Sequence, residues 1–241
     1  MTAVRTVPVA GSTNADLIAL ARAGEPEGDW LRAERQEAGR GRQGRAWSSP
    51  PGNLYASTII RLRPSDPSAP SLALVAAVAL AEAIIVASAG SLPIGRDGLI
   101  VRWPNDLLVD GAKLSGILLE RTDDAVVIGF GVNVAHHPEL ADRPTTDLKA
   151  IGITTTPEAL LALLVERLAA WLERWRGEGT GAVQARWLAL AQPIGTPLTA
   201  RLPDGTMVEG VFDGLSIDGA LRLGLADGTC RVIHAADLTS L

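Results

Sequence analysis

Lysine is scarce in this sequence of 241 residues, although basic residues are not. Of the 22 basic residues only Lys113 and Lys149 are lysines, which leaves 20 arginines. Because either residue usually serves on a surface, this ratio indicates a compositional bias toward arginine. A lysine that is retained inside a motif therefore indicates a need for an amine at that position.

Cysteine is scarcer still, with Cys230 as the only one. A lone cysteine excludes an internal disulfide and suits a reducing compartment. The first residues contain no apolar run typical of a secretory signal. The net charge of -5 argues against a protein that coats nucleic acid by charge alone, since neutralising phosphates needs a cationic face. We therefore expect a cytoplasmic protein.

Charged residues are almost absent from residues 71–95, where Glu82 is the only one. The length of the segment would allow a membrane span. Against this, alanine is more frequent in the segment than leucine or isoleucine, and a carboxylate near the middle of a span is costly. We expect instead a core helix over residues 71–89 and no association with a membrane.

Hydrophobic residues make up 47% of the chain, which is ample for a buried core. Apolar runs that look buried on both faces predict strands over residues 54–62, 99–103, 116–121 and 125–134. One helix is predicted after Thr13, where Thr13 and Asp16 form a capping box, and Gly24 is expected to end it. Two further helices are predicted, one from Thr156 onward and one around residues 183–190. Residues 35–45 and 48–52 predict one long loop that is not helical.

Beyond Pro193 the character of the sequence changes. Asp-Gly pairs at residues 204–205, 213–214, 218–219 and 227–228 punctuate short β-prone runs without helical periodicity, which predicts a small all-β unit. The fold class is thus α+β, and we predict two domains, residues 1–192 and 193–241.

The segment Gly39–Arg45 alternates glycines with Arg40, Arg42 and Arg45, and we call it the Gly–Arg loop. Flexible amides and permanently charged guanidinium groups suit the binding of a phosphate or a carboxylate. The segment matches GxGxxG, but it does not lead from a strand into a helix, so a dinucleotide-binding role fails on context. A solvated basic loop or an RNA contact remains open on composition alone.

The run Arg102-Trp103-Pro104-Asn105-Asp106 follows an apolar strand and presents Asn105 and Asp106 at its carboxyl end, where ligands commonly gather. The same run is also simply a good turn. Lys113 follows seven residues after Asp106, and a tight turn at Asp110-Gly111 would bring the two together. An ammonium group there could stabilise charge that develops in acyl or phosphoryl chemistry, whereas a mere surface pair would contribute little.

Gly129 and Gly131 occupy alternate positions of an apolar strand, so one face lacks side chains where another group approaches closely. Asn133, which follows them, could read the edge of a base. His136-His137 and His234 lack partners at zinc-ligand spacing, and no serine stands in a nucleophile elbow.

Taken together, these motifs resemble those of the biotin protein ligases, in order and in spacing. The motifs are Ser12-Thr13-Asn14, Gln36 with the Gly–Arg loop, residues 102–106, Lys113-Leu114-Ser115-Gly116 and residues 129–133. The resemblance implies a mixed β-sheet with flanking helices, akin to class II aminoacyl-tRNA synthetases, and a small C-terminal SH3-like β-barrel. It also implies that biotin and ATP with Mg²⁺ give biotinyl-5′-AMP, from which a lysine of a biotin carboxyl carrier domain takes the biotinyl group.

The resemblance further implies a set of site residues. Those expected to bind biotin are Ser12, Thr13, Asn14, Gln36, Gly39, Arg40, Lys113, Gly116, Leu118 and Gly131. Those expected to bind ATP and the adenylate are Arg42, Arg45, Trp47, Asn105, Asp106 and Asn133. Catalytic roles fall on Lys113, Arg40 and Arg42, and no metal ligands are assigned.

Two departures from the family pattern stand out. Arg102 replaces the lysine with which the family's motif usually opens, and a guanidinium is no exact replacement for an ammonium. About a dozen residues precede Ser12, too few for a winged helix, so we expect no binding to DNA. Two alternatives remain: a lipoate or octanoate ligase or transferase of the same fold, and a nucleotide- or RNA-binding protein that uses the Gly–Arg loop as a basic patch.

Overall fold

The computed structural model describes residues 3–95, 97–141 and 143–240. Within these ranges the strands form two sheets, a seven-stranded one and a five-stranded one. The strand order of the first is β1 (Val4–Ala10), β2 (Trp30–Gln36), β3 (Leu54–Arg61), β7 (Ala125–Val132), β6 (Ala112–Thr122), β5 (Asp106–Val109) and β4 (Leu99–Arg102). β1 and β2 run parallel and the other pairs are antiparallel, so the sheet is mixed.

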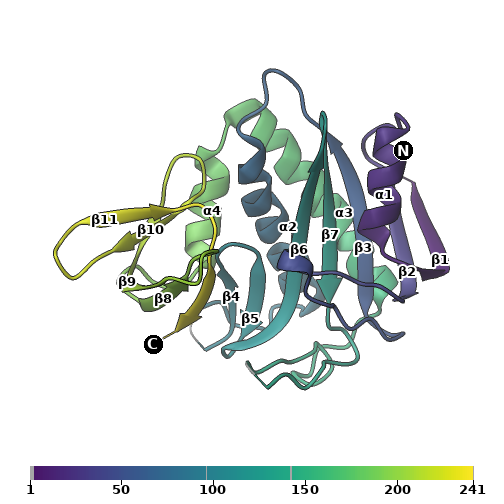
Figure 1. The fold of residues 1–241 in the computed structure, drawn as a ribbon. Helices are drawn as coiled ribbons and strands as arrows, with labels where there is room; N and C mark the ends of the chain where they lie inside the picture. Colours follow the sequence, from purple (N-terminus) through teal and green to yellow (C-terminus); the bar gives the residue numbers. More distant parts are fainter. Residues whose placement is uncertain (1–2, 96, 142, 241) are drawn as a thin grey trace.

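Helices cover both faces of this sheet (Figure 1). α1 (Thr13–Arg22) packs on one face, and α2 (Leu72–Ala87), α3 (Pro157–Glu178) and α4 (Gly181–Leu190) pack together on the other. Ile59 of β3 and Val127 of β7 pack with α1, whereas Ile60 and Val126 belong to the larger core on the opposite face. The central strands are thus buried on both faces, as their apolar runs predicted.

The apolar segment around α2 is a core helix. Residues Ala69–Ala87, a short 3-10 turn (Ala69–Ser71) followed by α2, are long and apolar enough to cross a membrane, but 67% of the segment is buried inside the protein. Glu82 accepts a hydrogen bond from Trp171 Nε1 of α3 at 2.8 Å and pairs with Arg186 Nε of α4 at 2.8 Å. This acid therefore ties α2 to both neighbouring helices, which explains a carboxylate in so apolar a sequence.

The N-cap of α1 is Ser12 rather than the predicted Thr13. Ser12 has extended backbone angles, and its side chain accepts from the Ala15 amide. The Thr13 hydroxyl is engaged with Gln36 and Ser57 instead, so it does not cap the helix. Gly24, with a φ of +91°, follows the helix end as predicted.

β1 and β2 were not predicted, and β5 lies outside the predicted strand ranges, although the turn expected at Asp110-Gly111 placed it in a hairpin. β1 is largely exposed and contains Pro8, and β2 carries several charged residues, so neither shows an apolar run. Arg35 and Gln36, which we expected to open the long loop, belong to β2. The loop contains one 3-10 turn, Arg42–Gly44, where no helical structure was predicted.

The second sheet is antiparallel and lies at the C-terminal end of the chain (Figure 1). Its order is β11 (Cys230–Ile233), β10 (Leu221–Gly224), β9 (Met207–Leu215), β8 (Pro197–Arg201) and β12 (Asp237–Ser240). Asp-Gly pairs make three of its turns, but Asp213-Gly214 lies inside β9, near an irregularity in its pairing with β10. The domain boundary at residue 193 and the SH3-like barrel remain predictions.

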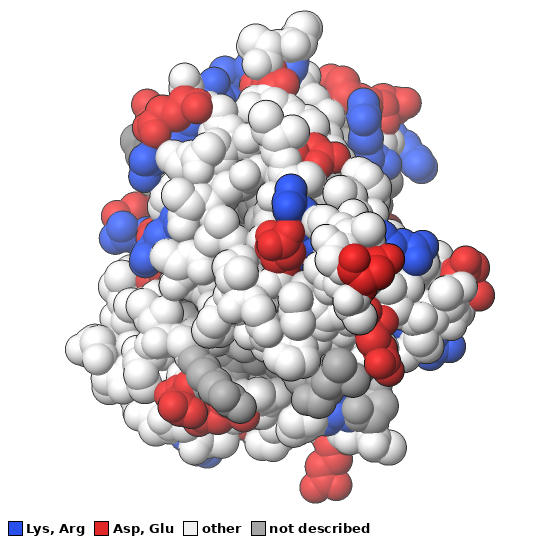
Figure 2. All heavy atoms as spheres, turned by 90° about the vertical axis from the view of Figure 1, so that its left-hand side faces the viewer, with Lys and Arg blue, Asp and Glu red and all other residues white. Residues whose placement is uncertain are grey.

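Figure 2 shows the side of the molecule that carries the C-terminal sheet and α4. Basic and acidic groups are interspersed there, and the described part of this face presents no continuous basic surface. A cationic face for nucleic acid is therefore absent from this described side.

Candidate active site

A cavity of about 690 Å³ opens on the α1 side of the large sheet. Every residue assigned to the expected site lines it, from the start of α1, the end of β2, the Gly–Arg loop, β5, β6 and β7. Other residues that line the cavity were not predicted from the sequence, chiefly Glu37, Ser49, Phe130, Arg143, Thr145 and Asp237. Residues far apart in the sequence thus converge on one concave site.

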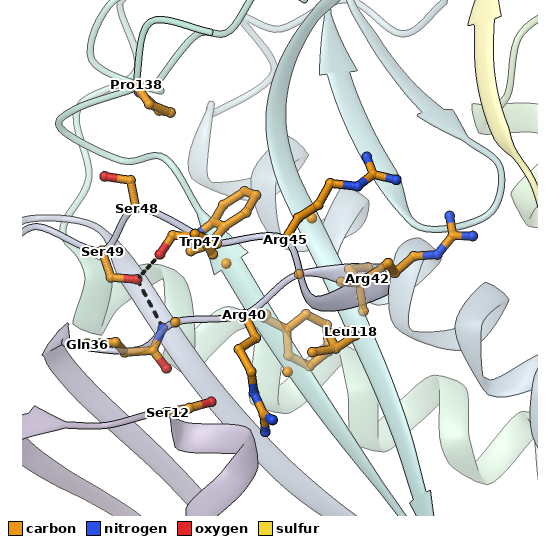
Figure 3. Close-up of a pocket in the computed structure, with 18 of the residues that line it drawn as sticks. Ser12, Gln36, Arg40, Arg42, Arg45, Trp47, Ser48, Ser49, Leu118 and Pro138 are labelled. Atoms are coloured by element: carbon orange, nitrogen blue, oxygen red, sulfur yellow. Dashed lines mark hydrogen bonds between the residues drawn. The ribbon is translucent and has the colours of Figure 1, made fainter. Parts of the chain in front are cut away.

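One end of the cavity is a polar network around Gln36. Its Oε1 accepts from the Thr13 amide at 2.9 Å and from Thr13 Oγ1 at 3.1 Å. Its Nε2 donates to Ser49 Oγ at 3.1 Å (Figure 3). The Thr13 hydroxyl also lies 2.7 Å from Ser57 Oγ, which donates to Asn14 Oδ1 at 2.6 Å. No role was predicted for Ser57, which lies in a strand expected to belong to the core. The network fixes the first turn of α1 against β2 and β3.

The same network continues to Glu120 of β6, another residue without an assigned role. Asn14 Nδ2 donates to Glu120 Oε2 at 2.9 Å, and Arg40 Nη2 lies 3.7 Å from Glu120 Oε1. The Arg40 side chain is 44% exposed. Arg40 is thus loosely held beside the polar network.

The glycines of β6 and β7 form a floor without side chains. A Cβ on Gly129 would lie 2.1 Å from Asn14 Oδ1, and one on Gly131 would lie 2.6 Å from Trp47 Cε2. Gly116 faces the same Trp47 ring, 3.2 Å from where its Cβ would be. The predicted close approach to this strand face is confirmed, and the approaching groups are Asn14 and Trp47.

Lys113 and Asp106 meet across the β5–β6 hairpin, as predicted. Asp110 and Gly111, both with positive φ, make the turn, and Lys113 Nζ lies 2.7 Å from Asp106 Oδ1. Both side chains are less than one-fifth exposed. Nζ also lies 5.6 Å from the Trp47 ring centroid, within cation–π range. Among the described residues, the buried Trp47 Nε1 has no hydrogen-bond partner.

The Gly–Arg loop is a tight hairpin that distributes its arginines. The Gly41 amide donates to the Arg45 carbonyl at 2.7 Å, and the Trp47 amide donates to the Gly39 carbonyl at 2.9 Å. Figure 3 shows Arg42 and Arg45 extending toward one side and Arg40 toward another. The loop thus supplies arginine side chains to both ends of the cavity.

Arg42 and Arg45 contact residues of two other segments. Arg42 Nη1 donates to Asn105 Oδ1 at 3.3 Å, and Arg42 Nη2 donates to the Ala236 carbonyl at 3.2 Å. Asp237 contacts Arg45 directly and lies 3.8 Å from Arg42. Burial lowers the pKa of Arg42, against which Asp237 and Asp106 raise it. Arg42 nevertheless remains a cation at neutral pH.

Arg102, the departure from the family pattern, points toward the C-terminal sheet. Its Nη1 donates to the Leu238 carbonyl at 3.5 Å. Burial lowers the pKa of Arg102, Asp106 raises it, and the charge of Arg143 lowers it further. Arg143, for which no role was predicted, also lines the cavity and adds a further cation to it.

Asn133 and His137 each contact a residue of the segment 146–147. Asn133 is buried, and its Nδ2 donates to the Thr146 carbonyl at 2.9 Å. His137 Nδ1 lies 2.5 Å from Asp147 Oδ2. Within the described residues, no group of three His, Cys, Asp or Glu side chains could hold a metal ion.

The sequence of this chain is similar to those of known proteins. The sequence pattern of the biotin/lipoate A/B protein ligase family matches residues 9–133. A biotin--[acetyl-CoA-carboxylase] ligase of Paracoccus denitrificans is 36% identical over 94% of this chain and 96% of that protein. This chain belongs to the biotin/lipoate A/B protein ligase family. The expected resemblance to biotin protein ligases is confirmed.

Other members of the family support the assignment. A biotin--[acetyl-CoA-carboxylase] ligase of Mycobacterium tuberculosis is 35% identical over 96% of this chain and 86% of that protein. The structure of the biotin protein ligase from Aquifex aeolicus in complex with biotin and ATP has a TM-score of 0.86, with 23% identity and full coverage of both chains. That likeness confirms the predicted fold class, a mixed sheet with helices and a separate antiparallel sheet.

Proposed function

We propose that this family member is an ATP-dependent biotin protein ligase. It activates biotin to biotinyl-5′-AMP and transfers the biotinyl group to a lysine of a biotin carboxyl carrier domain of the acetyl-CoA carboxylase type. The observation that carries this proposal is the convergence of all the expected site residues on one cavity. The names of the relatives favour biotin over lipoate as the substrate.

Biotin is assigned to the polar end of the cavity. Ser12, Thr13 and Gln36 offer hydroxyl and amide groups for the ureido ring, and the strand around Gly116 and Leu118 lines the pocket. Arg40 is the cation for the biotin carboxylate, because it lies beside this end and is held only by a 3.7 Å contact with Glu120. Asn14 and Gly39 serve as positioning residues in this scheme.

ATP is assigned to the end where Arg42 and Arg45 point. Both guanidinium groups would bind phosphates, and Asn105 would position Arg42 through the 3.3 Å hydrogen bond. Trp47, whose ring covers the glycine floor, would pack near the adenine. Asn133 would meet the base through Oδ1, since its Nδ2 is bound to Thr146.

Lys113 is assigned to the reacting centre, where Asp106 holds its ammonium group in place. In the first step a biotin carboxylate oxygen attacks the α-phosphorus of ATP, the bond to the β-phosphate oxygen breaks, and pyrophosphate leaves. In the second step the neutral amine of the carrier lysine attacks the carbonyl carbon, AMP leaves, and the amine loses a proton. Negative charge accumulates on oxygen in both transition states, and fixed cations lower both barriers.

Mg²⁺ would enter with the nucleotide phosphates, whose charge it neutralises. Magnesium is usually bound through substrate phosphates, water and one or two carboxylates, rather than by a dedicated protein cage. The cavity wall fits this requirement, because it supplies the carboxylate of Asp106, and the described residues include no group of three His, Cys, Asp or Glu side chains that could hold a metal ion. We also propose a cytoplasmic location, which the exposed, unpaired Cys230 suits.

The test is isotope exchange between pyrophosphate and ATP, measured with biotin, with lipoate and with neither. We expect exchange that depends on biotin. Exchange that proceeds equally without biotin, or with lipoate alone, would overturn the proposal. The second step is tested with a carrier domain and with the same domain carrying arginine at the acceptor lysine, which should remain unmodified.

A further inference from the structure

The arginines assigned to the phosphates already carry an anionic partner, which comes from the far end of the chain. Asp237 opens β12, and its two carboxylate oxygens face different guanidinium groups. Oδ2 contacts Arg45 Nη2 directly, and Oδ1 lies 3.8 Å from Arg42 Nη1. The two oxygens of one carboxylate thus face two guanidinium groups, as the oxygens of a phosphate group would.

The rest of this contact is formed by the backbone beside Asp237. Arg42 Nη2 donates to the Ala236 carbonyl at 3.2 Å, and Arg102 Nη1 donates to the Leu238 carbonyl at 3.5 Å. Residues 236–238 are therefore contacted by three arginines, of which two are phosphate candidates. β12 is an edge strand of the C-terminal sheet, hydrogen-bonded to β8.

The contacts are suited to exchange rather than to permanent anchoring. The side chains of Asp237 and Arg45 are 32% and 44% exposed, so water and salt screen their attraction. A triphosphate carries several negative charges and more acceptor oxygens than one carboxylate. Both anions need the same Nη atoms, so they compete for them.

We propose that Asp237 is an internal competitor of the nucleotide phosphates. In the free enzyme it occupies Arg42 and Arg45, and ATP takes over both guanidinium groups and releases the start of β12. The inference rests on the proposed function, because it needs ATP as a substrate of this cavity. Its consequence is that nucleotide occupancy is communicated to the C-terminal sheet.

Asp237→Asn tests the competition, because the amide keeps the size of the side chain and removes its charge. We expect the variant to bind a β,γ-imido analogue of ATP two- to fivefold more tightly in calorimetry, with biotin affinity unchanged. Since a tenfold change corresponds to about 1.4 kcal/mol, this gain lies within what exposed ion pairs contribute. The matched control is Asp213→Asn, which removes an ion pair with Arg222 in the same sheet and should leave nucleotide affinity unchanged.

Hydrogen exchange provides a second readout in the unmodified chain. The amides of residues 237–240 should exchange faster when the ATP analogue binds and should not respond to biotin alone. In Asp237→Asn they should already exchange faster without nucleotide. Because the exchange of the unmodified chain is measured with and without the nucleotide analogue, the release of β12 can be tested even if Asp237→Asn folds poorly.

The outcomes separate the two proposals. Weaker or unchanged nucleotide binding in Asp237→Asn, or slower exchange of β12 on nucleotide binding, overturns the role of Asp237 as a competitor while the ligase assignment stands. Failure of the unmodified chain to bind nucleotide and to catalyse biotin-dependent exchange defeats the ligase assignment itself.

Discussion

Lys113 and Asp106 form an ion pair across the β5–β6 hairpin, with Nζ 2.7 Å from Oδ1. The ring of Trp47, two residues after the Gly–Arg loop, lies over the same hairpin, near Lys113 and Gly116. Because the carboxylate fixes the direction of the ammonium group, the charge is in place before a substrate arrives. Such preorganisation is what makes a cation effective in a transition state.

Lys113→Ala should slow adenylate formation by about 100-fold or more while the protein stays folded, since loss of one preorganised group typically costs a factor of about 10²–10³. Biotin-dependent pyrophosphate exchange measures the rate, and thermal unfolding monitors the fold. Lys149→Ala is the matched control, because it removes the other lysine, which is exposed and does not line the cavity. Near-normal turnover in Lys113→Ala would refute the role.

Arg40→Ala should weaken biotin binding by about tenfold, the lower end of the loss expected for a hydrogen bond to a charged group, because Arg40 is partly exposed. Calorimetry with biotin measures the change. Arg174→Ala, which removes an exposed arginine paired with Glu178 on α3, should bind biotin normally. Equal biotin affinity in both variants would exclude Arg40 from the site.

Gly131→Ala should displace Trp47 and destabilise the fold by about 1–3 kcal/mol, because the new Cβ would lie 2.6 Å from Trp47 Cε2. Denaturant unfolding gives the stability, and calorimetry should show weaker nucleotide binding. Gly177→Ala has open space around its Cβ within α3 and should instead stabilise the protein by up to about 1 kcal/mol. A Gly131→Ala variant as stable as the parent would show that Trp47 moves aside freely.

The pair of Glu27 with Arg176 should make stability depend on acidity. Its contacts of 2.7 and 2.8 Å lower the pKa of Glu27 below 4.5, an effect led by the Arg176 hydrogen bond. A lowered folded-state pKa stabilises the fold above the unfolded value, and this stability is lost as the pH falls through the folded pKa. Glu27→Gln should therefore cost about 1–3 kcal/mol at pH 7 and progressively less below pH 4.5.

The control for this pair is Glu178→Gln. It removes an exposed partner of Arg174 and should leave unfolding unchanged at either pH. A Glu27→Gln penalty that stays constant between pH 7 and pH 3 would show that packing, rather than charge, is responsible.

The sequence predicted those parts of the fold that depend on local pattern. The turn at Asp110-Gly111 sets the register of β5 and β6, so the meeting of Lys113 with Asp106 could be derived from residues close in sequence. The alternation of Gly129 and Gly131 likewise predicted a bare strand face. In both cases a short segment carries the whole signal.

What could not be predicted depends on tertiary packing. Leu31 and Ala33 of β2 are buried, but the charged residues of this strand break its apolar pattern. Arg32 is also buried, and it pairs with Glu158 of α3, a partner that the local sequence does not indicate. Asp237 reaches the cavity only because the C-terminal sheet lies against the Gly–Arg loop. No local pattern marks such a residue, because its partners lie nearly 200 positions away in the sequence.

The confinement of Lys113 has a chemical consequence for the chain itself. An acyl adenylate acylates any neutral amine that reaches it, so an enzyme that makes one is exposed to its own intermediate. Here the side-chain amines are those of Lys113, held by Asp106, and of Lys149, outside the cavity. Guanidinium groups stay protonated and do not react in this way. The preference for arginine thus leaves only two side-chain amines that such an intermediate could acylate.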